Sequence, residues 1–539
     1  MPTAIEEKII RSALWAAYGD ILGFPSELLS AAEFERRRSK NKITEPIAWK
    51  KRQGGLFGAE IEFKPGCYSD DTQLRLSTCR AIRGNGYFDV ESFAKIELPV
   101  WLSYALGAGR GTKAAAGNLA LKETTWSQNF FSTDRSTYWN GGGNGAAMRI
   151  QPHVWANYKK GISSFLPDVV RNSICTHGHP RAIIGAAIHA SLLLHSINNK
   201  APADPKDWDS LGSDAASVAY ESILEDEELS LIWIPKWEIA SGKKLKEVWG
   251  TTIAEWVGAA QWAMSKCRNI SNREELYHLI LRELGGFSNE ERGSGLKTCL
   301  FASILAWLYK DDDPVAALLL SANTFKSDTD TIASMAGAII GVNAQTNPAT
   351  TIQDEQYIRE EALRLARIAE GARETSFNYP DLMCWSAPKA QGDTWIADEK
   401  LGEISGLGKL ISIGKEFTPR KDSKYLWQWC ELEFGQTILA KRRNYTIEAT
   451  SPQLSSTYEP TEPSHLIETI CKAPLEKKEL PHRPTINELT QSCIKSGFDP
   501  LTIGKALIYL AQGEDGIEKA IAFSAIIAKA KITRDSKIS

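Results

Sequence analysis

Two acidic stretches, far apart in the sequence, carry the side chains best suited to chemistry. Ser69-Asp70-Asp71-Thr72 and Asp328-Thr329-Asp330-Thr331 each place carboxylates and hydroxyls directly before an apolar, helix-like run. One such oxygen is enough to cap a helix, because the first turn of a helix leaves backbone amides without acceptors. The other carboxylates need a further partner, and hard divalent cations such as Mg²⁺, Mn²⁺ and Ca²⁺ prefer oxygen ligands of this kind.

If the fold brings both stretches together, four aspartates converge. Such crowding is costly without a counter-charge, because neighbouring carboxylates disfavour each other's ionised forms. We therefore expect two metal ions rather than one, with each stretch at the N-terminus of a helix. Taken singly, either stretch is explained as well by helix capping alone.

A glycine-rich stretch and a histidine are candidates for ligand contacts. Asn140-Gly141-Gly142-Gly143-Asn144-Gly145 allows close approach of backbone amides to a ligand, as a phosphate cradle requires. It lacks the Gly-Lys-Ser/Thr ending of a P-loop and follows no strand pattern, so a flexible turn is the alternative. His177 precedes an apolar helical pattern and is suited either to donate to a phosphate oxygen or to pack a turn.

Composition and charge exclude several classes of protein. The 539 residues are 43% hydrophobic and 24% charged, with a net charge of −3, which is typical of a globular protein of about two to four domains. This charge gives no overall electrostatic case for nucleic-acid or membrane binding. Nine cysteines without metal-ligand spacing predict reduced thiols. With no run of about 18 apolar residues and no signal-peptide pattern, the chain is predicted to be cytoplasmic and to lack a membrane span.

Helical periodicity predicts a mainly α chain up to about residue 375. An opening helix is expected from about Ile5 to Tyr18, one helix follows each acidic stretch, and a charged amphipathic helix spans Glu355–Arg373. The charged, glycine-rich residues 30–66 are interpreted as a connector and solvated surface. Residues 1–375 are therefore expected to form one helical domain.

The character of the sequence changes after residue 375. Strand-like stretches at Trp395-Ile396, Lys409–Phe417 and Tyr425–Lys441 predict a small β-containing module over residues 376–449. Residues 450–484, rich in Ser, Thr, Pro and Glu, predict a linker, and residues 485–539 predict a short helical module. We expect an unidentified protein partner for these C-terminal modules.

Taken together, the motifs resemble those of the ADP-ribosylglycohydrolase family. They occur in the family's order: Gly19-Asp20 with Glu27, Ser69-Asp70-Asp71-Thr72, Gly143-Asn144-Gly145 with Met148-Arg149, Thr176-His177, and Asp328-Thr329-Asp330-Thr331. The resemblance covers residues 5–375 and does not extend to residues 376–539. One departure is Ser69, where many members carry Thr; either residue offers a hydroxyl oxygen.

The resemblance implies a compact, orthogonal all-α bundle that holds two Mg²⁺ ions, with Mn²⁺ as the alternative. By position, the implied metal ligands are Ser69, Asp70, Asp71, Asp328, Asp330 and Thr331. Catalytic roles are implied for Glu27, Asp70, Asp71 and Asp328, and ADP-ribose contacts for Gly143, Asn144, Gly145 and His177. Asp20 belongs to the same signature, although a structural role for it is also open.

The activity implied by the resemblance is hydrolysis of the glycosidic bond between ADP-ribose and an acceptor, which breaks through an oxocarbenium-like transition state. The acceptor stays open between an Arg or Ser side chain, a nucleic acid and a small molecule. The expected partner is thus an ADP-ribosylated substrate. The alternative is a non-catalytic ADP-ribose-binding scaffold whose C-terminal modules recruit partners.

Overall fold

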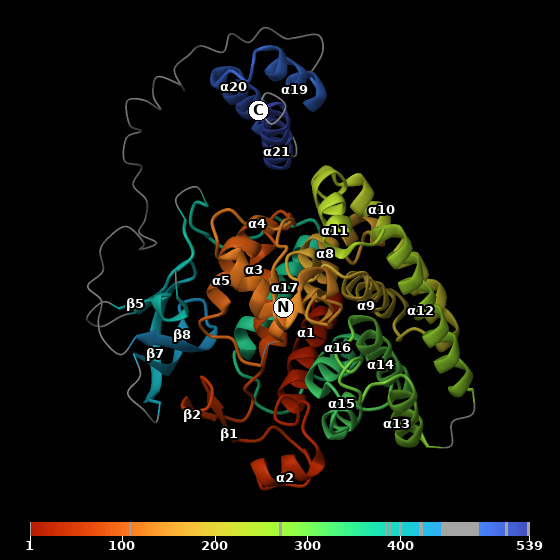
Figure 1. The fold of residues 1–539 in the computed structure, drawn as a ribbon. Helices are drawn as coiled ribbons and strands as arrows, with labels where there is room; N and C mark the ends of the chain where they lie inside the picture. Colours follow the sequence, from red (N-terminus) through yellow and green to blue (C-terminus); the bar gives the residue numbers. More distant parts are fainter. Residues whose placement is uncertain are drawn as a thin grey trace. The chain divides into compact units, whose positions relative to one another are not determined.

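The computed structural model describes residues 2–107, 109–268, 272–382, 385–388, 390–397, 402–419, 424–443, 484–512 and 516–535 of the chain (Figure 1). These residues belong to two units. One consists of Met1–Ile223 with Lys236–Ser455, and the other of Leu224–Pro235 with Ser456–Ser539. The expected linker 450–484 lies, apart from Pro484, outside the described residues.

The part of the chain before residue 370 is mainly helical, as the sequence predicts. Its α-helices are α1 (Ala4–Gly23), α2 (Ala31–Arg38), α3 (Asp70–Ala81), α4 (Val90–Ser92), α5 (Leu98–Trp101), α6 (Arg110–Leu119), α7 (Gln151–Trp155), α8 (Leu166–Ile174), α9 (Pro180–Asn199), α10 (Trp208–Glu225), α11 (Ile234–Ser241), α12 (Leu245–Lys266), α13 (Arg273–Glu283), α14 (Gly295–Leu308), α15 (Pro314–Asn323), α16 (Thr329–Gly341) and α17 (Glu355–Ala369).

Helices α1 and α16 cross with their backbones in contact. A Cβ atom on Gly23 would lie 2.3 Å from the Cα of Asp330, and one on Gly337 would lie 2.2 Å from the carbonyl oxygen of Trp15. Only glycine permits such an approach, because any side chain would overlap the facing backbone. The crossing places the end of α1, which leads into Glu27, beside the start of α16.

Helix α9 is long and apolar enough to cross a membrane by length and composition alone. However, 89% of its apolar 18-residue stretch is buried inside the protein. Ile183 and Leu193 on this helix are fully buried. A helix that is apolar on all sides is equally typical of the core of a large protein, and α9 occupies that position here.

Residues 30–66, interpreted from the sequence as a connector, contain regular structure. They form helix α2 and an antiparallel hairpin of β1 (Trp49–Gln53) and β2 (Ala59–Phe63). The interpretation as a connector was therefore wrong where these three elements lie, whereas most residues of the segment are exposed or half-buried, as the interpretation expected of a solvated surface. Trp49, Ile61 and Phe63 are buried on one face of the hairpin, and this alternation is the signal that the high charge concealed.

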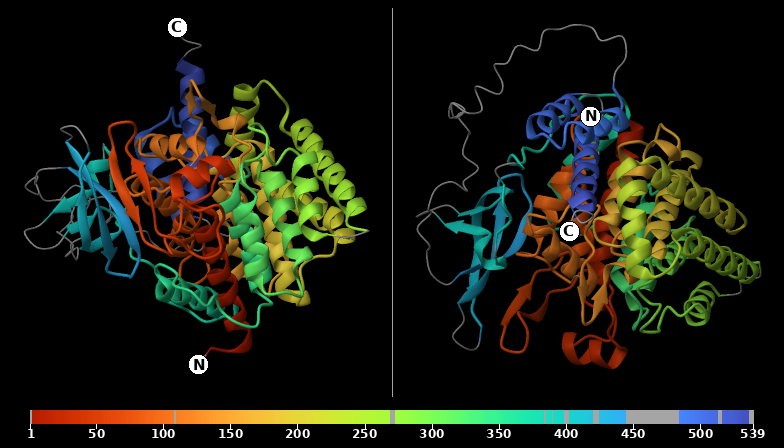
Figure 2. Two further views of the ribbon diagram at one scale, coloured as in Figure 1. Left: turned by 90° about the horizontal axis from the view of Figure 1, so that it is seen from below. Right: turned by 45° about the horizontal axis from the view of Figure 1, so that its top comes forward.

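A five-stranded antiparallel sheet follows the bundle, with its strands in sequential order (Figures 1 and 2). Its strands are β5 (Trp395–Ala397), β6 (Gly402–Ile404), β7 (Gly408–Phe417), β8 (Tyr425–Leu432) and β9 (Thr437–Arg443). The stretch Tyr425–Lys441 thus forms a hairpin of two strands. A further, shorter hairpin joins β3 (Ser132–Thr133) and β4 (Ser136–Thr137) within the helical part.

The sheet packs directly on the rest of its unit. The indole N–H of Trp429 donates to the carbonyl oxygen of Glu62 in β2 at 3.2 Å. The guanidinium of Arg80, on α3, donates to the side-chain oxygen of Gln436 at 2.6 Å and to Glu97 at 2.7 Å. The bonds of Arg80 are buried, so the sheet and the bundle share a polar network in their interior.

After residue 484, where the sequence predicts a short helical module, the second unit contains α19 (Ile486–Lys495), α20 (Pro500–Ala511) and α21 (Gly516–Asp535). A capping box between Thr485 and Glu488 begins α19. A small apolar core joins the helices through Cys493, Ala506, Leu510, Phe523 and Ile527. At 20 residues, α21 is the longest of these three helices.

Candidate active site

The first acidic turn begins α3 and is held by a buried aspartate. Ser69 caps the helix, because its hydroxyl accepts from the Asp71 N–H at 3.2 Å. Asp20, on α1, accepts from the Ser69 N–H at 2.9 Å, the Thr72 N–H at 3.0 Å and the Thr72 hydroxyl at 2.6 Å. Burial raises the pKa of Asp20. Asp20 therefore positions the turn, which is the structural alternative that the sequence left open.

The second acidic turn begins α16 and lies against the first. Asp328 occupies the N-cap position without a side-chain capping bond, and its carboxylate accepts from the Asn144 amide at 2.8 Å. The Thr331 hydroxyl donates across to the Asp71 carboxylate at 3.4 Å. The fold thus brings together the two stretches that the sequence singled out.

Glu27 completes the acidic cluster. Single carboxylate oxygens of Glu27, Asp328 and Asp330 lie within 4.8 Å of one another. The turn that carries Glu27 is fixed on both sides: the Ser26 hydroxyl donates to a carbonyl oxygen of α15 at 2.6 Å, and the Leu28 N–H donates to the carbonyl oxygen just before Asp328 at 3.2 Å.

The electrostatics of the cluster fit an oxygen-bound divalent cation. Burial, and then the neighbouring carboxylates, raise the pKa values of Asp71 and Asp330 well above their usual range. The same two causes, with Asp328 as the main neighbour, raise the pKa of Glu27 to about 8. One carboxylate oxygen of Asp71 is buried and has no hydrogen-bond partner among the described residues. A bound cation would neutralise these charges and coordinate that oxygen.

The glycine-rich loop is clamped to the segment before α14. The Asn144 N–H donates to the carbonyl oxygen of Gly293 at 2.9 Å, and the Gly295 N–H donates to the carbonyl oxygen of Gly142 at 3.0 Å. A Cβ atom on Gly145 would lie 2.9 Å from the His177 ring. The loop is therefore held in place at both edges and has no room for a side chain at position 145.

His177 lies beneath this loop as a neutral imidazole. It is buried, and the Thr176 hydroxyl lies 2.7 Å from its Nδ1 atom. Burial and the nearby Arg149 lower its pKa to about 3. Since the ring is uncharged at neutral pH, it offers one N–H donor and one acceptor.

A cavity of about 410 Å³ lies over the acidic cluster. Ten residues suggested by the sequence line it: Glu27, Asp70, Asp71, Gly143, Asn144, Gly145, His177, Asp328, Asp330 and Thr331. Ser69 is fully buried and is not among the lining residues. The size is in the range typical of small-molecule sites.

The rim of the cavity adds three arginines that sequence reasoning missed: Arg110, Arg135 and Arg292. Among the described residues, no ion pair neutralises any of them. Arg110 and Arg135 are exposed, and Arg110 stands between two glycines at the start of α6. Arg292 also adjoins a glycine, Gly293, whereas Arg135 does not. Proximity to glycine is too common to mark a site without the fold.

Residues 1–374 match the family model of the ADP-ribosylglycohydrolases, which covers more than half of the chain and the whole acidic cluster. The chain belongs to the ADP-ribosylglycohydrolase family. The family match ends before the five-stranded sheet.

Two curated proteins are similar. The chain is 24% identical over 199 residues to the ADP-ribosyl-[dinitrogen reductase] glycohydrolase of Rhodospirillum rubrum, a match spanning 36% of this chain and 60% of that protein's length. It is 23% identical over 349 residues to protein YegU of Escherichia coli K12, a match spanning 63% of this chain and 89% of that protein's length. A solved structure described as an ADP-ribosylglycohydrolase-related protein complex has a TM-score of 0.41 at 18% identity, covering 68% of this chain and 98% of that one.

Proposed function

We propose that this chain is a metal-dependent hydrolase that cleaves the glycosidic bond between ADP-ribose and an acceptor. The family supports the reaction class. The observation that carries the proposal is the meeting of two acidic turns and Glu27 at the floor of a cavity whose rim bears arginines. The floor suits cations and the rim suits the diphosphate of ADP-ribose.

The acidic floor offers the ligands for one or two Mg²⁺ or Mn²⁺ ions. These ligands would be Asp70, Asp71, Asp328, Asp330 and Thr331, with the hydroxyl of Ser69 as a further oxygen. Bound ions of this kind supply Lewis-acid polarisation of ribose hydroxyls and a more acidic water.

The chain's own side chains would position the sugar and move the proton. Glu27 borders the cluster on the cavity side, so its carboxylate is placed to accept a proton from the attacking water. Asn144 is oriented by its bonds to Asp328 and to the Thr298 hydroxyl at 3.1 Å. The Asn144 side chain therefore joins the glycine-rich loop to the acidic floor.

The loop and the rim would hold the remote part of the substrate. The backbone of Gly143 is partly exposed at the cavity, and Gly145 packs against the His177 ring. The neutral His177 ring offers a donor to a phosphate or ribose oxygen. Arg110, Arg135 and Arg292 would add charge-assisted bonds to the diphosphate. Binding energy from these contacts positions the anomeric carbon over the floor.

The test is a turnover panel with the full chain. Arg-linked, Ser-linked and nucleic-acid-linked ADP-ribose are incubated with and without EDTA, and free ADP-ribose is measured. We expect release from at least one acceptor, its loss with EDTA and its return with excess Mg²⁺.

The scaffold alternative makes a different prediction in the same experiment. Calorimetry with ADP-ribose, run beside the panel, would then show tight binding while no acceptor is cleaved. The large C-terminal region outside the family match motivates this alternative. The acidic floor favours hydrolysis, because a protein that only binds a diphosphate gains nothing from crowded carboxylates.

A further inference from the structure

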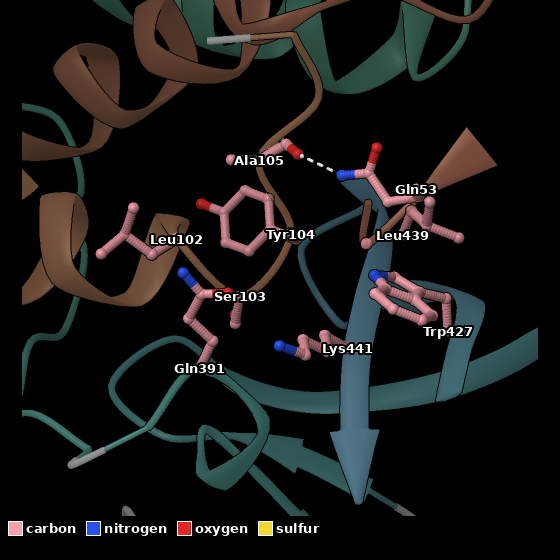
Figure 3. Close-up of a pocket in the computed structure, with 10 residues that line it drawn as sticks. Gln53, Leu102, Ser103, Tyr104, Ala105, Gln391, Trp427, Leu439 and Lys441 are labelled. Carbon is pink, nitrogen blue, oxygen red and sulfur yellow. Dashed lines mark hydrogen bonds between the residues drawn. The ribbon is translucent and has the colours of Figure 1, made fainter. Parts of the chain in front are cut away.

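A second, smaller pocket lies where the sheet meets the bundle (Figure 3). Its volume is about 100 Å³. It is enclosed by the end of β1, the segment that follows α5, a short 3₁₀ helix (Gln391–Asp393), and strands β8 and β9. The lining residues are Gln53, Gly54, Leu102, Ser103, Tyr104, Ala105, Gln391, Trp427, Leu439 and Lys441.

Lys441 is the charged residue of this pocket. Its ammonium lies 4.5 Å from the centre of the Tyr425 ring and 5.8 Å from that of Trp427. Burial lowers its pKa. Among the described residues, no aspartate or glutamate lines the pocket, and no carboxylate forms an ion pair with this ammonium.

The two residues that follow Lys441 on β9 each form an ion pair with a carboxylate. Arg442 pairs with Glu416, and Arg443 pairs with Asp393, the acidic residue of the 3₁₀ helix that borders the pocket. Glu416 and Asp393 are thus paired with arginines and not with Lys441. A partly buried cation facing a cavity without a counter-charge favours an anion in that cavity.

Other polar groups converge on the same space. Figure 3 shows the side chains of Lys441 and Gln391 reaching toward Ser103. The Gln53 amide already donates to the Ala105 carbonyl oxygen at 3.3 Å. Because the Gln53 amide is engaged in this way, the amide that can donate to a bound oxygen beside the ammonium is that of Gln391.

We propose that this pocket binds a small oxyanion, with the Lys441 ammonium as its counter-charge. The volume exceeds what a single water needs and is well below that of typical pockets for larger ligands. The ligand class is therefore a short carboxylate or an ion of phosphate size. A nucleotide does not fit.

The pocket is connected to the first acidic turn through the backbone of its lining. The Tyr104 carbonyl oxygen accepts from the Gln73 amide at 3.2 Å, and the Leu106 carbonyl oxygen accepts from the Asp70 N–H at 2.7 Å. The segment that lines the pocket is therefore hydrogen-bonded to the start of α3 and to the first acidic turn.

The experiment uses the metal-free full chain, titrated with sodium acetate or sodium phosphate against sodium chloride at constant ionic strength. Calorimetry gives the affinity, and the thermal midpoint gives the stabilisation. We expect binding of at least one oxyanion, at least tenfold weaker binding in Lys441→Gln, and about threefold weaker binding in Gln391→Ala. Arg442→Gln is the matched control on the same strand and should retain the affinity.

The two arms also distinguish the ligands, since binding of acetate alone identifies a carboxylate and binding of phosphate alone identifies a phosphate-sized ion. Phosphate bound elsewhere is recognised because Lys441→Gln leaves it unchanged. The proposal is overturned if neither oxyanion binds, or if Lys441→Gln binds both as tightly as the unmodified chain. Gln391 is exposed, so its variant decides the matter if Lys441→Gln does not fold: unchanged affinity overturns the proposal.

Discussion

The two acidic turns contain the same types of residue but use their oxygens differently. In the first turn, Ser69 caps α3 and the buried Asp20 accepts three hydrogen bonds from the turn. In the second, Asp328 makes no capping bond and accepts from a side chain of the glycine-rich loop. A signature of Ser, Thr and Asp therefore combines residues that hold a turn with residues that face a ligand, and only the fold separates them.

The largest effect is expected at the ligand-facing turn. Asp328→Asn should lower hydrolysis by at least about a thousandfold, equivalent to about 4 kcal/mol of transition-state stabilisation, while the thermal midpoint of the metal-free protein does not fall. Turnover and circular dichroism measure the two quantities. Asp313→Asn is the matched control, because Asp313 caps α15 outside the cavity. Near-normal turnover in Asp328→Asn would remove this residue from the mechanism.

Asp20, which holds the first turn, should affect stability more than turnover. Asp20→Ala leaves three buried donors of the first turn without their acceptor, at a cost of about 3–5 kcal/mol in the free energy of unfolding. Denaturant titration measures this loss. If Asp20→Ala is as stable as the unmodified chain, the distinction between holding and ligand-facing residues fails.

The first turn is also tied to the sheet, through a titratable group. The Tyr68 hydroxyl and the Thr437 N–H both donate to the Asp354 carboxylate, and burial raises the pKa of Asp354 from 3.8 to about 6. Because the pKa of Asp354 is raised in the folded state, its protonated carboxyl group stabilises the folded chain. This stabilisation is fully present below pH 3.8 and is lost as the pH rises through about 6. The loss is at most about 3 kcal/mol, at 1.36 kcal/mol per pKa unit.

Asp354→Asn tests this dependence. Unfolding free energies measured from pH 4 to pH 7 should show the decline in the unmodified chain, and a decline smaller by up to about 3 kcal/mol in the variant. Parallel curves for the two proteins would show that Asp354 does not link the turn to the sheet in this way.

The smallest effect is expected at the glycine-rich loop. Gly145→Ala places a methyl group 2.9 Å from both the His177 ring and the Thr112 hydroxyl, so a neighbour of the loop must shift. We expect KM for an ADP-ribosylated substrate to rise about tenfold, which corresponds to a loss of about 1.4 kcal/mol of binding free energy. The change in kcat should be smaller. Gly117→Ala, on the open side of α6, is a suitable control because nothing lies within 4 Å of its added Cβ. An equal response of both variants would argue against a substrate role for the loop.

The sequence predicted the helical class of the fold and the residues that meet at the cavity floor. It succeeded because the helices have clear periodicity and the acidic stretches precede two of them. It did not reveal the β1–β2 hairpin, whose apolar face is interleaved with Lys50, Lys51 and Arg52. Alternation over so few residues is easily hidden by charge.

The rim of the cavity could not be predicted for a different reason. Arg110, Arg135 and Arg292 come from three separate segments and meet only in the folded chain. An exposed arginine carries no local pattern that distinguishes a ligand contact from a solvated surface. The cytoplasmic location and the protein partner of the C-terminal modules stay predictions.

The central claim is that the acidic floor is a divalent-cation site, and thermal unfolding with and without Mg²⁺ tests it most directly. At a concentration a hundredfold above Kd, Mg²⁺ should stabilise the unmodified chain by about 2.7 kcal/mol. Asp71→Asn should lose this gain and Asp313→Asn should keep it. The same test with Mn²⁺ covers the other expected ion. If neither ion raises the thermal midpoint, or if Asp71→Asn responds as fully as the unmodified chain, the account is contradicted.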